Sequence, residues 1–329
     1  MKKNFPEAEV DVACMFSGVE YVFNHNEKIN KIYRLSLYSG NKWQGFKQLL
    51  SLRKEKYNIS ILAFPCYRRE YNFVHWLVGA KKRIAHKFNK GFYREFHFLN
   101  TDLVEVDESD HNVINNLNLL KPLGINWQDR FKKEDLHYVL KLNQKDIDFG
   151  KDYIKQLSWE NEKIIAIHPG STNSPAALLR RWPIERYAAV AKFLIKDKKS
   201  RILIFAGSDE KELGQELNML INDNIDCKLV TGTNFGQSLG ILNYINLLIC
   251  NENGFSHLAV ALGKKTIMLE ASTNPVWSAP FDSNLLTVIR PDNFKPWYRY
   301  DLKRTVPVGA EGGIDKITIK DVLILLNER

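Results

Sequence analysis

The stretch Lys163–Pro183, KIIAIHPGSTNSPAALLRRWP, decides the fold of this chain. Its apolar run Ile164–Ile167 predicts a buried strand of a parallel sheet. Gly170 follows that run and allows a tight turn, with close approach of the backbone to a ligand. Pro183 suits the first turn of a helix, which the apolar spacing predicts over residues 184–196. The stretch therefore predicts a strand, then a loop of the kind that binds phosphate groups, then a helix.

Two arginines lie just before that helix. Arg180 and Arg181 place guanidinium groups beside free backbone N–H groups and the positive end of the helix dipole. All three features favour a bound phosphate. The alternative interpretation is a solvated helix start with no ligand.

Strands and helices alternate along the rest of the chain in two blocks. The first block has predicted strands at residues 10–14, 31–35, 58–64 and 81–85, and predicted helices at 43–54, 70–78 and 107–120. The second has six predicted strands at residues 164–167, 201–206, 228–230, 247–250, 266–269 and 285–289. This alternation predicts two doubly wound α/β domains that bind ligands at the carboxyl ends of their strands. We place the domains at 1–155 and 156–329, with 121–160 as a polar, irregular connection and the C-terminal helix as a candidate to cross back.

Two further loops contain polar groups that could bind a ligand. Asn251–Ala259, NENGFSHLA, follows a predicted strand and opens a helix. There Gly254 permits close backbone approach, Ser256 and the first N–H groups can meet phosphate oxygens, and Glu252 can accept hydrogen bonds from sugar hydroxyls. Glu270–Pro275 leaves the next strand with several hydroxyls. We expect the three loops to converge at one sheet edge.

Composition narrows the class of protein. The 329 residues carry a formal charge of +9 and are 44% hydrophobic, without an apolar run long enough to span a bilayer. Lys and Arg are spread along the chain and no nucleic-acid motif occurs, so we expect no nucleic-acid partner. The cysteines are widely spaced, which predicts reduced thiols and no zinc site. A cytoplasmic protein is expected, and the basic, aromatic-rich first half suits either peripheral contact with an anionic membrane or plain solvation.

The ordered blocks resemble a known family. HPGS with RRWP, FAGS at Phe205–Ser208, TGT at Thr231–Thr233, NENGFSHLAVALG at Asn251–Gly263 and ASTNP at Ala271–Pro275 are similar to glycosyltransferase family 9, the ADP-heptose:lipopolysaccharide heptosyltransferases. Their order and spacing match over roughly residues 160–282. The first half resembles the family more loosely, at residues 3–12, 78–85 and 107–124.

The resemblance implies a GT-B fold with two Rossmann-like domains, a nucleotide-sugar donor on the C-terminal domain and a glycan or glycolipid acceptor on the other. It implies ADP-heptose or a relative as donor, inversion at the anomeric carbon, and neither a cofactor nor a metal. The residues assigned to the donor, from the loops and by position in the blocks, are Ser171, Arg180, Arg181, Ser208, Glu210, Glu252, Asn253, Gly254, Ser256, His257 and Thr273. Arg68 and Arg69, after a predicted strand, are assigned to an anionic acceptor.

Several of these residues also have structural interpretations. His257 lies on an apolar helix face and can be a hydrogen-bonded structural histidine. Glu210 can simply complement the dipole of a first helical turn. Arg68 and Arg69 can be surface residues. Asp146-Ile147-Asp148 imitates a metal-binding D-x-D motif but lies in a lysine-rich connection, so we assign no metal to it.

The chain departs from the family pattern in two loops and at its start. Glu252 stands where the family has aspartate, which can shift contacts to the donor sugar, and Ala271 replaces a glycine. Family members open with a strand, a Gly-Asp turn and a helix that ends like Lys2–Pro6. The resemblance places the catalytic base, an aspartate, on that turn, so it falls before residue 1 and no residue here is assigned the role.

The missing opening strand predicts that the first domain lacks a central strand of its sheet. Backbone hydrogen-bonding groups of the neighbouring strands and part of the core surface would then be exposed. An upstream start or a truncated gene is favoured over a repurposed relative. The leading hypothesis is a glycosyltransferase of surface-glycan synthesis. The alternatives are a catalytically inactive nucleotide-sugar-binding relative and, with poorer agreement of the five blocks, a nucleotide-sugar 2-epimerase.

Overall fold

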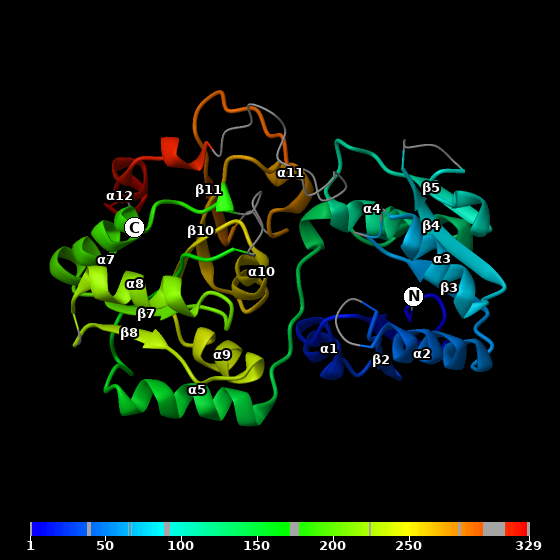
Figure 1. The fold of residues 1–329 in the computed structure, drawn as a ribbon, viewed down its shortest axis with the longest axis horizontal. Coiled ribbons are helices and arrows are strands. Elements are labelled where there is room, and N and C mark those ends of the chain that lie inside the picture. The colour runs from blue at the N-terminus through cyan, green and yellow to red at the C-terminus, as the bar shows by residue number, and fades with distance from the viewer. Residues whose placement is uncertain are drawn as a thin grey trace. The chain divides into compact units, whose positions relative to one another are not determined.

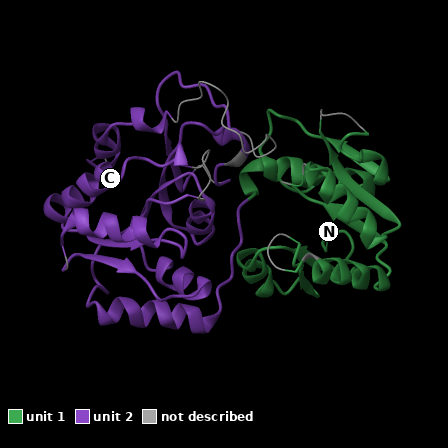
Figure 2. Cartoon of the chain, viewed as in Figure 1, with its two compact units in different colours: residues 1–136 green, residues 137–329 purple. Residues whose placement is uncertain are grey.

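The chain forms two compact units, residues 1–136 and 137–329 (Figure 2). The computed structural model describes residues 2–37, 41–64, 66, 68–88, 93–171, 178–223, 225–281, 284–298 and 313–327. Each unit has its own parallel β-structure and its own hydrophobic core (Figure 1).

Unit 1 contains two separate parallel sheets. One pairs β1 (Val12–Cys14) with β2 (Ile32–Arg34), with Val12 opposite Ile32. The other has the order β3-β4-β5, formed by Ile59–Leu62, Lys82–Lys87 and Asp102–Glu105. The four strands predicted in this half are present and shorter than or close to their expected ranges. β5 was not predicted, because its sequence, DLVE, is short and half polar.

The helices of unit 1 pack on these sheets. They are α1 (Ser17–Asn24), α2 (Lys42–Lys54), α3 (Arg69–Val78) and α4 (Asn112–Asn118), with 3-10 turns at His97–Leu99, Lys121–Leu123, Trp127–Asp129 and Lys133–Asp135. α2 and α3 contribute Leu49, Leu52 and Leu77 to a core cluster that also holds Leu35 after β2. The helix predicted over 107–120 begins only after its N-cap His111, whose Nδ1 accepts the Val113 N–H at 3.0 Å.

Unit 2 is built on one six-stranded parallel sheet with the order β11-β10-β9-β6-β7-β8. Its strands are β6 (Ile164–His168), β7 (Arg201–Phe205), β8 (Cys227–Val230), β9 (Leu247–Asn251), β10 (Lys265–Leu269) and β11 (Leu286–Ile289). All six predicted strands of this half are present. Every residue of β6 is buried, as expected for a central strand of a parallel sheet.

Helices cover both faces of that sheet (Figure 1). They are α5 (Gln144–Gln156), α7 (Ile184–Lys198), α8 (Lys211–Ile221), α9 (Phe235–Leu242), α10 (Gly254–Ala261), α11 (Pro275–Ser278) and α12 (Ile319–Asn327), and a 3-10 turn lies at Ile314–Lys316. Buried residues of α7, α8 and α12 form one core with the inner side chains of the strands. Pro183 is the N-cap of α7 and not part of its first turn.

The boundary between the units falls at Leu136, earlier than the expected position near residue 155. The reason is α5, which lies in the segment expected to be irregular and packs on α9. At their crossing a Cβ on Gly240 would lie 1.8 Å from the backbone oxygen of Asp146, so the two helices approach closely. α12 also stays in unit 2, where it packs on α7 and does not leave as a crossing helix.

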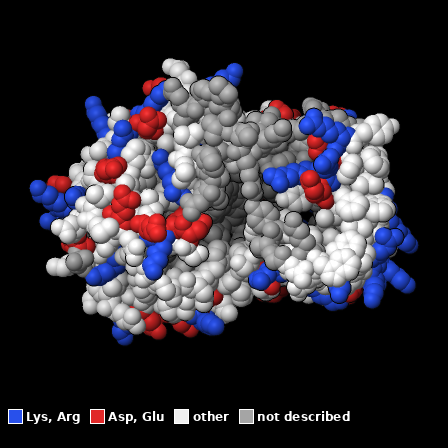
Figure 3. Space-filling view, viewed as in Figure 1, with Lys and Arg blue, Asp and Glu red and all other residues white. Residues whose placement is uncertain are grey.

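On the face in Figure 3, Lys and Arg are interspersed with Asp and Glu over the described residues. Within the described residues, no helix is long and apolar enough to cross a membrane.

Candidate functional site

Three loops leave neighbouring strands of unit 2 at the same edge of the sheet. They follow β6, β9 and β10, which are adjacent in the order β10-β9-β6, and each loop begins at the carboxyl end of its strand. The expected convergence of these loops is therefore present. In a doubly wound sheet this edge is where ligands bind.

Asn251, the last residue of β9, joins the loop after β6 to the start of α7. It is fully buried, and its Oδ1 accepts the Trp182 N–H at 3.0 Å and the Tyr187 hydroxyl at 2.9 Å. Its Nδ2 donates to the Pro169 carbonyl at 2.6 Å. Sequence reasoning did not assign Asn251 a role, because the contacts come from residues far away in the chain.

A buried ion pair fixes the turn after β9. Arg180 Nη1 donates to Glu252 Oε2 at 2.5 Å, and Thr273 Oγ1 donates to the same oxygen at 3.3 Å. The Arg180 guanidinium also lies over the Tyr298 ring, 4.6 Å from its centroid. All three interacting polar residues are less than a tenth exposed. Arg180, which was expected beside a phosphate, thus connects the loop before α7 to the turn after β9.

Arg181 is placed differently from its neighbour. Its Nε donates to Ser171 Oγ at 3.1 Å and its Nη2 donates to the Ser171 carbonyl at 2.6 Å. The side chain is only partly buried. A guanidinium is consequently held against the loop that follows β6.

The end of β6 carries a buried polar cluster. Asn253 Nδ2 donates to His168 Nδ1 at 3.1 Å, which leaves Nε2–H facing Glu210 Oε2 at 3.4 Å. Burial lowers the pKa of His168 to about 4, so the ring is neutral near pH 7. Burial raises the pKa of Glu210. His168 also stacks on Phe255, with ring centroids 4.8 Å apart.

Gly170 and Glu210 fit each other. A Cβ on Gly170 would meet the Glu210 carboxylate, so a side chain at this position would require Glu210 to move. Glu210 Oε2 accepts the Gly207 N–H at 3.2 Å. Glu210 is therefore a buried support of the loop that follows β6. Ser208, which like Glu210 lies in the loop after β7, is exposed.

At the N-terminus of α10, some of the predicted site residues are buried and others are exposed. Asn253 Oδ1 accepts the Phe255 and Ser256 N–H groups, and Ser256 Oγ donates to the Asn253 carbonyl at 2.7 Å. Ser256 is fully buried, so its hydroxyl supports the turn. Gly254 is exposed, and a Cβ there would meet no described atom within 4 Å. His257 Nδ1 lies 3.2 Å from the Tyr138 hydroxyl.

Glu270, after β10, is a buried carboxyl that sequence reasoning did not single out. It is 2% exposed, and among the described residues neither of its carboxylate oxygens has a hydrogen-bond partner. Burial, followed by the charge of Glu252, raises the pKa of Glu270 to about 8, against opposing effects of Arg290 and Arg180. Near neutral pH this carboxyl is mostly protonated. The feature of the sequence that could have identified Glu270 as buried was its position directly after an apolar strand.

The remaining predicted residues lie in unit 1. Arg68 is the N-cap of α3, and Arg69 forms an exposed ion pair with Glu70 at 3.6 Å. Among the residues described, no group of three or more His, Cys, Asp or Glu could hold a metal ion. Asp146 of the D-x-D sequence is buried in α5.

The family model described as glycosyltransferase family 9 (heptosyltransferase) matches residues 72–299. This chain therefore belongs to glycosyltransferase family 9, and its fold is the α/β GT-B fold. It is 27% identical to lipooligosaccharide heptosyltransferase 2 of Haemophilus influenzae over 144 residues, which are 43% of this chain and 40% of that relative. The match thus spans about two fifths of the curated relative.

Solved structures extend the likeness over nearly the whole chain. E. coli ADP-heptose lipopolysaccharide heptosyltransferase II superposes with a TM-score of 0.75 at 20% identity, covering 99% of this chain and 91% of that one. A family 9 glycosyltransferase from Veillonella parvula gives a TM-score of 0.79 at 19% identity, covering 99% and 90%. At these identities the superpositions establish the fold.

Proposed function

We propose that this chain is a glycosyltransferase that moves a heptose or related sugar from a nucleoside diphosphate donor, ADP-heptose, to a lipopolysaccharide or other surface glycan. Two features of the loops carry the proposal. The Arg181 guanidinium is hydrogen-bonded to Ser171, and Gly254, in the first turn of α10, faces open space. The family membership and the names of the relatives support this choice of substrates.

The diphosphate is proposed to lie against the loops after β6 and β9. Arg181 supplies a guanidinium fork, and the positive end of the α10 dipole adds to the attraction for an anion. Gly254 lacks a packing reason in the described structure, whereas Gly170 has one, so Gly254 is the position where a side chain would obstruct a ligand. The buried Arg180–Glu252 pair positions the turn that presents Gly254 and Asn253.

The proposed reaction is an inverting displacement. The acceptor hydroxyl oxygen forms a bond to the anomeric carbon, the bond from that carbon to the diphosphate oxygen breaks, and the hydroxyl proton passes to a general base. Charge grows on the departing diphosphate, where Arg181 and the α10 N-terminus stabilise it. We propose that these groups act without a metal ion, and that the protein works at the cytoplasmic face of the inner membrane, with Arg68 and Arg69 on the acceptor side.

The test is transfer itself. The purified chain is incubated with ADP-heptose and heptose-deficient lipopolysaccharide, with and without EDTA, and ADP release and acceptor mass are measured. Equal release of ADP and gain of one heptose mass in both samples is expected. Loss of transfer in EDTA, restored by added metal, would contradict metal independence.

A second candidate function is donor binding without transfer, and the separated sheets of unit 1 favour it. Saturable ADP-heptose binding with no transfer to any lipopolysaccharide acceptor would support this candidate. Absence of both binding and transfer would refute the donor site altogether.

A further inference from the structure

The loop after β10 carries two buried polar side chains that have no partner among the described residues. Glu270 is the first residue of this loop, and its backbone N–H donates to the Ile289 carbonyl at 3.0 Å. Its side chain is 2% exposed, and neither carboxylate oxygen has a hydrogen-bond partner in the part of the chain that the structure describes. The buried hydroxyl of Ser272 is in the same position there.

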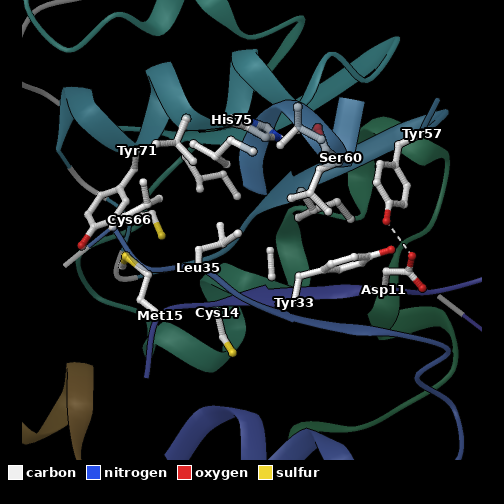
Figure 4. A pocket seen from close by; sticks show the side chains of 18 of the residues that line it. Asp11, Cys14, Met15, Tyr33, Leu35, Tyr57, Ser60, Cys66, Tyr71 and His75 are labelled. Carbon is white, nitrogen blue, oxygen red and sulfur yellow. Dashed lines mark hydrogen bonds between the residues drawn. The ribbon is translucent and has the colours of Figure 1, made fainter. Parts of the chain in front are cut away.

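Such groups are exceptional, because buried polar atoms in proteins are mostly hydrogen-bonded. Unit 1 shows the usual arrangement at the cavity of about 590 Å³ between its two sheets (Figure 4). There the Tyr57 hydroxyl donates to Asp11 Oδ2 at 2.6 Å, and Ser60 Oγ lies 2.6 Å from His75 Nε2. Burial of Glu270 without a partner costs stability, and this cost points to a role in function.

Three charged side chains act on Glu270, each from a different element. Glu252 lies on the turn after β9, Arg180 precedes α7, and Arg290 follows β11. Burial, followed by the charge of Glu252, raises the pKa of Glu270 to about 8, and the two arginines oppose this rise. Near neutral pH the four side chains therefore hold two positive charges and one negative charge. Ionisation of Glu270 removes the remaining net positive charge.

The loop that holds Glu270 also touches the turn that is proposed to bind the donor. The Ser272 carbonyl accepts the Tyr298 N–H at 2.8 Å, which fixes the backbone of the loop. Thr273 Oγ1 donates to Glu252 Oε2 at 3.3 Å, which connects the loop to the turn after β9. A change in the charge of Glu270 therefore acts on the side chains of that turn.

Ionised Glu270 is a second carboxylate near one guanidinium. Arg180 Nη1 donates to Glu252 Oε2 at 2.5 Å, and this buried pair positions the turn that presents Gly254. A second carboxylate repels Glu252 and competes for Arg180, so it weakens the pair and displaces the turn. Loss of the net positive charge also weakens the attraction for an anionic diphosphate. Both effects make donor binding stronger when Glu270 is protonated.

We propose that Glu270 is a positioning residue of the donor site whose neutral form preserves the Arg180–Glu252 pair, so that binding of an anionic nucleoside diphosphate transfers a proton from solvent to the ionised Glu270 carboxylate. This inference rests on the proposed donor site and adds to it a titrating group that the donor does not touch. Because the donor prefers the protonated form, its affinity is highest below pH 8 and falls above it.

Calorimetric titration of ADP-heptose into the full chain tests the inference. Titrations at pH 7 and pH 9 compare affinities, and pairs of buffers with different ionisation enthalpies at pH 6.5 and pH 8.5 report proton uptake. The wild type should lose about threefold to tenfold in affinity between pH 7 and pH 9, and should take up about 0.3–0.6 proton per donor at pH 8.5 but almost none at pH 6.5. Both phosphates of the donor are esterified and do not titrate in this range.

Three variants separate Glu270 from other titrating groups. Glu270→Gln keeps the size of the side chain and cannot ionise, so its affinities at pH 7 and pH 9 should be equal and its binding should take up no proton. Glu212→Gln makes the same change at an exposed position in the first turn of α8 and should follow the wild type. Arg290→Gln removes a charge that favours ionised Glu270, so the fall in affinity should move to higher pH. Circular dichroism at pH 7 checks that each variant is folded.

Three results would overturn this role of Glu270 while leaving donor binding intact. The first is equal affinity of the wild type at pH 7 and pH 9 without proton uptake. The second is the wild-type pH dependence retained in Glu270→Gln, and the third is tighter binding at pH 9 with proton release. No binding of ADP-heptose by the wild type at any pH would instead refute the proposed donor site, and the role of Glu270 with it.

Discussion

Unit 2 and unit 1 are both built from alternating strands and helices, yet one has a continuous six-stranded sheet and the other has two sheets with a cavity between them. In unit 2 the central strand β6 is buried throughout and paired on both sides. In the described residues of unit 1, β1 pairs with β2 and β3 pairs with β4, and no strand lies between β1 and β3. The difference shows that local patterns form the elements, whereas a central strand joins them into one core.

The largest expected effect compares core positions in the two sheets. Ile167→Ala in β6 removes a side chain that is fully buried, so we expect a loss of about 2–5 kcal/mol in the free energy of unfolding. Ile61→Ala in β3 borders the existing cavity, and we expect a smaller loss there, because fewer contacts are lost. Denaturant unfolding of both variants measures this. Equal losses would show that unit 1 is as tightly packed as unit 2.

The next effect concerns the pH dependence of unit 2. The pKa of Glu270 is about 8 in the fold and near 4.5 when unfolded, so the folded state binds the extra proton between these values. The stabilisation is complete below pH 4.5 and is lost as pH rises through 8. We expect the free energy of unfolding to fall by about 2–4 kcal/mol from pH 5 to pH 9 on account of this group.

Glu270→Gln removes that proton linkage and keeps the size of the side chain. Unfolding of wild type and variant at a series of pH values should therefore give a shallower decline for the variant. Parallel curves would show that Glu270 is ionised in the fold near neutral pH.

A smaller effect distinguishes two glycines of unit 2. Gly240→Ala would place a Cβ against the Asp146 carbonyl and force α5 and α9 apart, at a cost of about 1–3 kcal/mol. Gly254→Ala meets open space and should leave stability unchanged or raise it by about 0.5 kcal/mol. Donor affinity, measured in parallel, should fall only in Gly254→Ala. A Gly254→Ala protein with full donor affinity would remove that glycine from the ligand site.

Much of unit 2 was predictable from the sequence because its strands are continuous apolar runs. β6, β7 and β9 are runs of this kind, and their order along the chain predicted three loops at one edge. α5 was missed for a physical reason. Its buried positions, four residues apart, are Asp146, Gly150 and Ile154, so two of the three side chains on that face are not apolar.

The site itself was predictable only in outline. The residue types in the loops after β6 and β9 indicated anion binding, and in the structure Arg181 donates hydrogen bonds to Ser171 in the loop after β6. The ion pair that Arg180 forms with Glu252 could not be predicted from the sequence. It depends on the adjacency of β6 and β9, which brings Glu252 next to an arginine 72 positions away.

Calorimetric titration of ADP-heptose into the full chain tests the central claim, that unit 2 binds the donor through the loop at Arg181. Wild type and the surface control Lys192→Ala, on the exposed side of α7, should bind one equivalent with equal affinity. Arg181→Ala should bind about 1–3 kcal/mol more weakly, the usual loss for a charged hydrogen-bond partner. Unchanged affinity in Arg181→Ala, or no binding by the wild type, would contradict the account.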